Sequence, residues 1–143
     1  MNEDAMFCVG QKAFINKGNE VLVLSDPEEG LDFPGGKIQV GEANVKDLSS
    51  LARSLQREVR EETGLEIEVG DPFTVWYNEF PKNHRNYPKV VYLVGFKCKY
   101  VSGEVQLSHE HSNFQWVNKN NYPKADDKSN YFKVLDKYFK EIQ

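Results

Sequence analysis

The sequence predicts an α/β fold in which a mixed β-sheet lies between helices. Strand-like runs rich in Val, Phe, Tyr and Trp alternate along the chain with two stretches whose apolar residues recur every three or four positions. The 143 residues have the length of one ordinary domain, and no internal repeat or Pro/Ser-rich linker divides them. We therefore expect a single domain over residues 1–143.

The first half of the chain is expected to form a hairpin, a loop and a helix. Apolar runs at 7–15 and 20–25 flank the Asn- and Gly-containing segment 16–19, which suits a hairpin turn. Residues 26–36 are rich in Asp, Pro and Gly and predict a loop without regular structure. Helical spacing of apolar residues then predicts a helix over 45–63, which ends before a glycine. Its apolar face consists of Leu48, Leu51, Ala52, Leu55 and Val59.

The second half is expected to add strands and a closing helix. Residues 66–80 and 89–100 are rich in β-branched and aromatic residues and predict two strands, joined by the polar connection 81–88. A shorter strand is expected at 113–117. From Lys128 onward the apolar residues again have helical spacing and predict a second amphipathic helix. They are Tyr131, Val134, Leu135, Tyr138, Phe139 and Ile142.

The charge balance excludes some classes of protein. Eighteen Lys and Arg against 22 Asp and Glu leave a net charge of -4, the reverse of the basic excess that binding to a nucleic-acid backbone requires, so no stable nucleic-acid complex is expected. No apolar run approaches the roughly 20 residues of a membrane span, and the amino terminus is acidic. We expect a cytoplasmic protein without a membrane segment, in which Cys8 and Cys98 are reduced structural thiols.

Two segments contain the residues that could bind a ligand or take part in catalysis. At about 100° per residue, Glu58, Glu61 and Glu62 fall within an arc of roughly 100° on the predicted helix, where like charges repel. A solvated face with Arg/Glu pairs would explain them, and so would a bound Mg²⁺, which prefers oxygen ligands. The Gly35–Gly36 pair, taken alone, could be a simple turn, but glycines also let the backbone approach a ligand or an ion.

Together the two segments resemble the box of the Nudix hydrolase family, G-x5-E-x7-R-E-U-x-E-E-x-G-U, where U is aliphatic. An aromatic-x-Gly-Gly lead-in precedes it at 33–36. The one departure is that fourteen residues, 43–56, stand where the family pattern has seven, and we expect a solvent-side excursion near 43–50 to absorb the difference. The matching residues are Gly36, Glu42, Arg57, Glu58, Val59, Glu61, Glu62, Gly64 and Leu65.

The resemblance implies an α/β/α sandwich and a metal-dependent pyrophosphohydrolase, which cleaves a small-molecule nucleotide whose diphosphate is linked to another group. It implies that Mg²⁺ or Mn²⁺ is held mainly by Glu58 and Glu62, with the Gly35 carbonyl as a further oxygen and Glu61 as a weaker or second-metal ligand. Glu42 and Arg57 would be structural.

The resemblance leaves the general base open between Glu58 and Glu110, which lies in the polar loop 108–111. His109 and His111 in that loop are expected to be ordinary loop histidines, because a hard cation prefers oxygen. A non-catalytic module that binds a nucleotide or a protein is the alternative, but such a module has no need of the intact carboxylates. The sequence does not indicate the physiological substrate, the phosphorus attacked, or whether the protein is a monomer or a homodimer.

Overall fold

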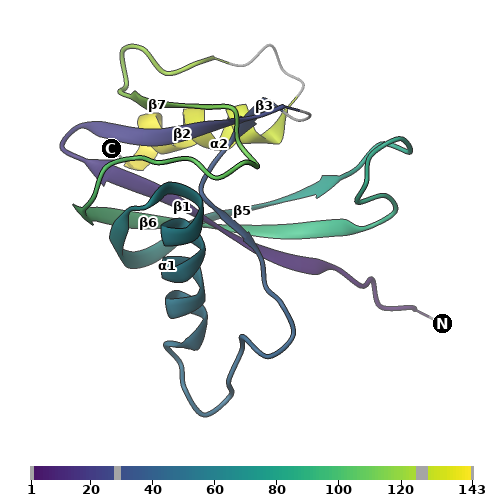
Figure 1. The fold of residues 1–143 in the computed structure, drawn as a ribbon. Coiled ribbons are helices and arrows are strands. Elements are labelled where there is room, and N and C mark those ends of the chain that lie inside the picture. The colour runs from purple at the N-terminus through teal and green to yellow at the C-terminus, as the bar shows by residue number, and fades with distance from the viewer. Residues whose placement is uncertain (1, 28–29, 125–128, 143) are drawn as a thin grey trace.

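The computed structural model describes residues 2–27, 30–124 and 129–142, and these form one mixed sheet between two helices (Figure 1). The strand order is β3-β2-β1-β6-β5, with β4 paired to β1 and β7 paired to β2. This arrangement confirms the predicted sandwich. The elements are β1 (Cys8–Lys17), β2 (Glu20–Asp26), β3 (Gly30–Asp32), β4 (Gly35–Lys37), α1 (Ser50–Thr63), β5 (Glu66–Glu79), β6 (Val90–Ser102), β7 (Asn113–Val117), α2 (Asn130–Lys137) and the π-helical turn η1 (Tyr138–Ile142).

Strand β1 lies at the centre of the molecule, because it pairs with β6 in parallel on one side and with β4 on the other. Both of its faces are covered. Ala13 and Ile15 belong to the apolar cluster that includes Leu55 and Val59 of α1, whereas Phe14 belongs to the cluster on the α2 side. Within β1, the continuous apolar run that is typical of a strand covered on both faces is limited to residues 13–15, because Gln11 and Lys12 precede it.

Helix α1 brings its C-terminal turn close to the sheet. Val59 and Glu62 are both buried there, and the helix stops at Gly64, whose φ of 77° is left-handed. The amide of Gly64 donates to the carbonyl of Arg60 at 2.8 Å, so the predicted glycine stop is confirmed.

The helix predicted from residue 45 begins at Ser50, so the first turn of the prediction is wrong. Leu48, expected on the apolar face, is 101% exposed. The physical reason is that the side chains of Asn44 and Asp47 accept hydrogen bonds from amides two residues further on, at 3.0 and 2.9 Å, and so compete with helix formation. Residues 38–49 form an exposed loop of turns that projects from the body (Figure 1).

One further expectation needs correction. The segment 26–36 is not free of regular structure, because the short strands β3 and β4 extend the sheet beside β2 and β1 and so pair their main-chain polar groups. The second helix begins at Asn130 and is capped by Ser129, whose side chain accepts from the Tyr131 amide at 3.1 Å. Its predicted start at Lys128 lies outside the described residues.

Cys8 and Cys98 are free thiols, as expected. Burial raises the pKa of Cys98 to about 12, so this thiol stays protonated and unreactive. Among the described helices, none has the length and apolar character that a membrane span requires.

Deleting residues 43–49 tests whether the long loop matters for folding. The deletion restores a seven-residue spacing between Glu42 and Arg57 and removes the exposed ion pair between Asp47 and Arg53. We expect the free energy of unfolding to change by about 1 kcal/mol or less, since exposed pairs and loop length contribute little. Urea denaturation of the wild type and the deletion variant measures this change. A decrease of several kcal/mol in the free energy of unfolding would show that the loop supports the core.

Candidate active site

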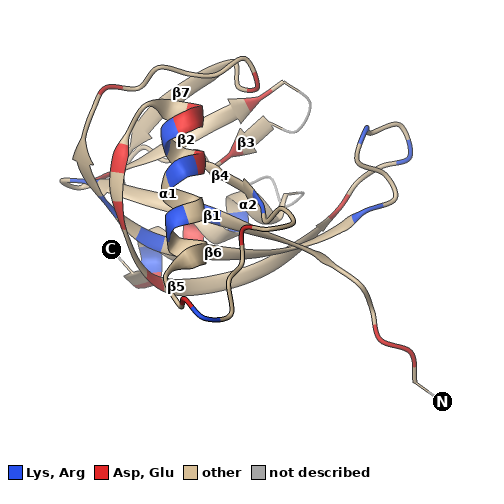
Figure 2. Cartoon of the chain, turned by 60° about the horizontal axis from the view of Figure 1, so that its bottom comes forward, with Lys and Arg blue, Asp and Glu red and all other residues tan. Residues whose placement is uncertain are grey.

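A cleft opens where four segments of the chain meet: the C-terminal half of α1, the turn at β4, the loop between β5 and β6, and the loop before β7. An inner cavity of about 130 Å³ and an outer one of about 680 Å³ lie side by side. Helix α1 carries both acidic and basic residues, and basic residues gather on the β5–β6 loop (Figure 2). Residues lining both cavities include Gly35, Gly36, Lys37, Glu62, Arg85, Asn86 and Glu110.

The glycine pair is required by close contacts on two sides. Gly35 has a φ of 131°, and a Cβ atom there would lie 2.0 Å from the carbonyl oxygen of Gln11 in β1. A Cβ on Gly36 would lie 2.4 Å from Oε2 of Glu58. Gly35 therefore has no room for a side chain against the sheet, and a side chain on Gly36 would displace the Glu58 carboxylate.

Glu62 is the most constrained carboxylate of the cleft. Its Oε1 accepts a hydrogen bond from the Gly35 amide at 3.2 Å, whereas its Oε2 is buried and finds no hydrogen-bond donor among the described residues. Burial raises the pKa of Glu62 to about 8 despite the nearby Lys12 ammonium. When Glu62 is ionised, its Oε2 accepts no hydrogen bond from the described residues, and a bound cation would supply the missing contact.

Glu58 and Glu110 reach the same cleft from different elements. Glu58 lines the outer cavity, and burial raises its pKa against the opposing effect of Arg57, whose Nη2 lies 3.8 Å from Oε1. Glu110 is exposed, but it can bring a carboxylate oxygen within 4.8 Å of ligand atoms on Glu62 and His111. The structure therefore gathers three of the predicted carboxylates at one opening.

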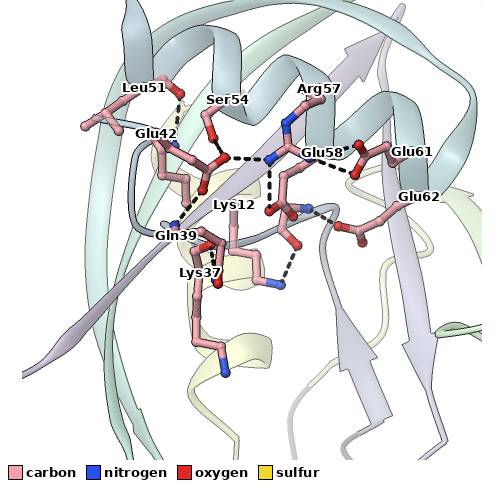
Figure 3. A network of polar contacts seen from close by, with 12 residues as sticks. Lys12, Lys37, Gln39, Glu42, Leu51, Ser54, Arg57, Glu58, Glu61 and Glu62 are labelled. Atoms are coloured by element: carbon pink, nitrogen blue, oxygen red, sulfur yellow. Dashed lines mark hydrogen bonds and ion pairs between the residues drawn. The ribbon is translucent and has the colours of Figure 1, made fainter. Parts of the chain in front are cut away.

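Glu61 does not line either cavity. Its carboxylate is 61% exposed and accepts two hydrogen bonds from Nη1 of Arg57, at 2.9 and 2.8 Å. Arg57 also pairs with Glu42, which accepts a hydrogen bond from the Ser54 hydroxyl (Figure 3). Arg57 thus ties the loop before α1 to the helix, an arrangement that suits the structural roles expected for Glu42 and Arg57.

The structure corrects the expectation for His111, while His109 is exposed as a loop residue should be. His111 is buried, and its Nε2 lies 2.9 Å from Oδ2 of Asp32. The loop is drawn inward because the Ser108 amide donates to the carbonyl of Glu62 at 3.1 Å and the Ser112 amide donates to that of Ser25 at 2.9 Å.

Sequence reasoning missed Lys12 and Asp32. Nζ of Lys12 lies 2.9 Å from Oδ1 of Asp32 and donates to the Phe33 carbonyl at 3.2 Å, and both side chains are buried. Burial opposes both charges, but the mutual attraction raises the pKa of Lys12 and lowers that of Asp32. The available signal was a lysine inside an apolar strand, since a buried charge needs a partner.

The comparison with protein families decides the assignment. A family model described as the NUDIX domain matches residues 8–138. The chain belongs to the Nudix hydrolase family. The match spans every element described above from β1 to α2, including the cleft.

Solved Nudix structures share this fold. The MutT protein from Methanosarcina mazei Go1 is 26% identical, with 98% of this chain and 100% of that chain covered and a TM-score of 0.69. An ADP-ribose pyrophosphatase from Streptococcus suis 89-1591 is 18% identical, with 96% of each chain covered and a TM-score of 0.63.

A UDP-X diphosphatase is 18% identical with a TM-score of 0.63 and 94% of this chain covered, but this chain spans only 63% of its length. A search of curated protein sequences finds no match.

Proposed function

We propose that this Nudix hydrolase is a divalent-cation-dependent pyrophosphohydrolase that cleaves a nucleoside diphosphate linked to another group, by water attack on phosphorus. The observation that carries the proposal is the buried Oε2 of Glu62, which accepts no hydrogen bond from the described residues, beside a cleft where Glu58 and Glu110 converge. Like charges and unpaired buried oxygens destabilise a fold, so a module that only binds nucleotides or proteins has no use for them. This favours the enzyme over the binding module.

Mg²⁺ or Mn²⁺ fits the donors of this cleft, because they are carboxylate and carbonyl oxygens. Glu58 and Glu62 would hold the cation, with the Gly35 carbonyl as a further oxygen. Glu61 would take part only after leaving Arg57. When bound, the cation would lower the pKa of the attacking water and neutralise negative charge on the phosphate.

The opposite wall of the cleft suits the rest of a nucleotide. Lys37 and Arg85 line both cavities and offer cationic donors for phosphate oxygens, and Lys37 donates to Oδ1 of Asn86 at 3.2 Å, which links β4 to the β5–β6 loop. Phe80 and Tyr131 line the inner cavity and present aromatic surface on which a base could stack. Free thiols and a nucleotide substrate fit a cytoplasmic enzyme.

A substrate panel tests the proposed function. Nucleoside triphosphates, ADP-ribose, sugar nucleotides and dinucleoside polyphosphates are incubated with Mg²⁺, with Mn²⁺ and with excess chelator, and release of phosphate or nucleoside monophosphate is measured. We expect turnover of at least one class with either cation and none in chelator. Turnover that persists in chelator would refute the cation requirement, and no turnover of any class would favour the binding module.

Glutamine variants separate the two candidate bases. We expect Glu110→Gln to lower kcat by about 10² to 10⁴ fold without changing the Mg²⁺ concentration for half-maximal rate, because a proton acceptor is lost but no ligand. Glu58→Gln should shift that Mg²⁺ concentration upward. Rates are measured across a Mg²⁺ titration, with the exposed Glu104→Gln as the control. A wild-type rate for Glu110→Gln would remove this residue from the mechanism and leave Glu58 as the base.

A further inference from the structure

A closed ring of polar contacts lines the inner cavity of the cleft. Nζ of Lys12 lies 2.9 Å from Oδ1 of Asp32, and Oδ2 of Asp32 lies 2.9 Å from Nε2 of His111. Nδ1 of His111 lies 3.7 Å from Oε2 of Glu62, whose Oε1 accepts from the Gly35 amide at 3.2 Å. The Gly35 carbonyl closes the ring, because it accepts from Lys12 at 3.5 Å.

The four side chains of the ring are all at least nine-tenths buried. Burying ionisable groups costs free energy unless each charge has a partner, and well-packed apolar residues are often as stable or more stable in such places. Lys12 and Asp32 neutralise each other directly. A ring of this kind therefore contributes less to stability than apolar packing would. Its role is better sought in the groups that it holds in place.

The ring holds Glu62 and the segment that precedes the glycine pair. Lys12 binds the segment before Gly35 at two points, the carboxylate of Asp32 and the carbonyl of Phe33. The Gly35 amide in turn fixes Oε1 of Glu62.

The contact between Glu62 and His111 differs from the other contacts of the ring. At 3.7 Å it is longer than a hydrogen bond, and both Oε2 of Glu62 and Nδ1 of His111 are without a hydrogen-bond partner among the described residues. The ring therefore anchors Glu62 through one oxygen and keeps the other available.

We propose that Lys12, Asp32 and His111 are positioning residues that orient the free oxygen of Glu62 toward a divalent cation. The inference rests on the proposed cation site at Glu62, and it adds that the affinity of this site is set by residues from β1, β3 and the loop before β7. Partners behind a metal ligand typically change metal affinity by about 10- to 100-fold when they are removed.

Two variants test the ring without leaving a buried charge unpaired. Lys12→Met/Asp32→Asn removes both charges together. His111→Leu keeps the Lys12–Asp32 pair and replaces the imidazole by an apolar side chain of similar bulk. Tyr122→Phe is the control for loss of a partly buried polar contact elsewhere, because its hydroxyl donates to Asp136 at 2.6 Å on the α2 side.

The measurement is Mn²⁺ binding followed by electron paramagnetic resonance, on protein whose folded fraction is fixed by circular dichroism. We expect Mn²⁺ to bind both ring variants about 10- to 100-fold more weakly, with Tyr122→Phe unchanged. The Mg²⁺ concentration for half-maximal rate should rise by a similar factor, while kcat at saturating Mg²⁺ recovers to within a few fold.

The outcomes separate the two proposals. If the wild-type protein binds no Mn²⁺, the proposed function fails. If the wild type binds Mn²⁺ and Glu62→Gln loses it, but either ring variant retains wild-type affinity, the ring is purely structural and the inference is overturned.

Discussion

Replacing Glu62 by glutamine should lower turnover at limiting Mg²⁺ by about 10² to 10³ fold, since an anionic oxygen that accepts no hydrogen bond from the described residues is lost from the proposed cation site. High Mg²⁺ should recover part of the loss, because the other ligands remain. Rates measured over a Mg²⁺ titration, beside Glu104→Gln as the control, give the result. Unchanged Mg²⁺ dependence would mean that Glu62 is not a ligand.

The same substitution should stabilise the cation-free protein. Burial raises the pKa of Glu62 to about 8, from 4.5 in the unfolded chain, so between these values the folded state binds more protons. Its contribution to stability is present below about pH 4.5 and is lost as the pH rises through 8. Glutamine does not titrate, so the free energy of unfolding of the variant should exceed that of the wild type by on the order of 1–3 kcal/mol near pH 8.

Urea denaturation in chelator at pH 5, 7 and 9 measures this difference. The advantage of Glu62→Gln should grow with pH, and in excess Mg²⁺ it should shrink or reverse, because the cation binds the folded wild type. An advantage that falls as the pH rises would contradict the burial argument.

The second large effect concerns the glycine pair, whose two members should respond differently to alanine. Gly35→Ala places a methyl group 2.0 Å from the main-chain carbonyl of Gln11 at a φ of 131°, so the backbone itself must move. We expect a loss of about 3–5 kcal/mol in the free energy of unfolding, from strain and overpacking together. A melting temperature at least ten degrees lower would follow.

Gly36→Ala meets only the end of the Glu58 side chain, which can rotate away. Its melting temperature should stay within a few degrees of the wild type, while Mn²⁺ affinity should fall because the proposed ligand Glu58 is displaced. Thermal melts in chelator and Mn²⁺ titrations of both variants decide the matter. Equal destabilisation by the two substitutions would show that the turn adapts as a unit.

The sheet, both helices and the site segment could be predicted because each depends on local patterns. The apolar spacing of Leu55 and Val59 identified α1, and the stop at Gly64 follows from the backbone conformation that a helix end adopts. The start of α1 was misjudged because Asn44 and Asp47 bind nearby amides, a competition that apolar spacing does not record.

The ring that lines the inner cavity could not be predicted from spacing, because its partners are remote in sequence. Lys12 and Asp32 are 20 residues apart, and His111 lies 79 residues beyond Asp32. Only the three-dimensional pairing of β1, β3 and the loop before β7 brings them together. A single charged residue in an apolar strand signals that a partner exists without indicating which residue it is.

The wide sequence separation of the ring residues has a consequence for biosynthesis. Its members extend from Lys12 to His111, so Glu62 lacks one of its neighbours until the loop before β7 has left the ribosome and docked. A nascent chain that ends before residue 111 already carries Glu58, Glu61 and Glu62, yet has no complete support for a cation. Ribosome-bound chains should therefore gain high-affinity Mn²⁺ binding only when synthesis passes that loop, late in the translation of the domain.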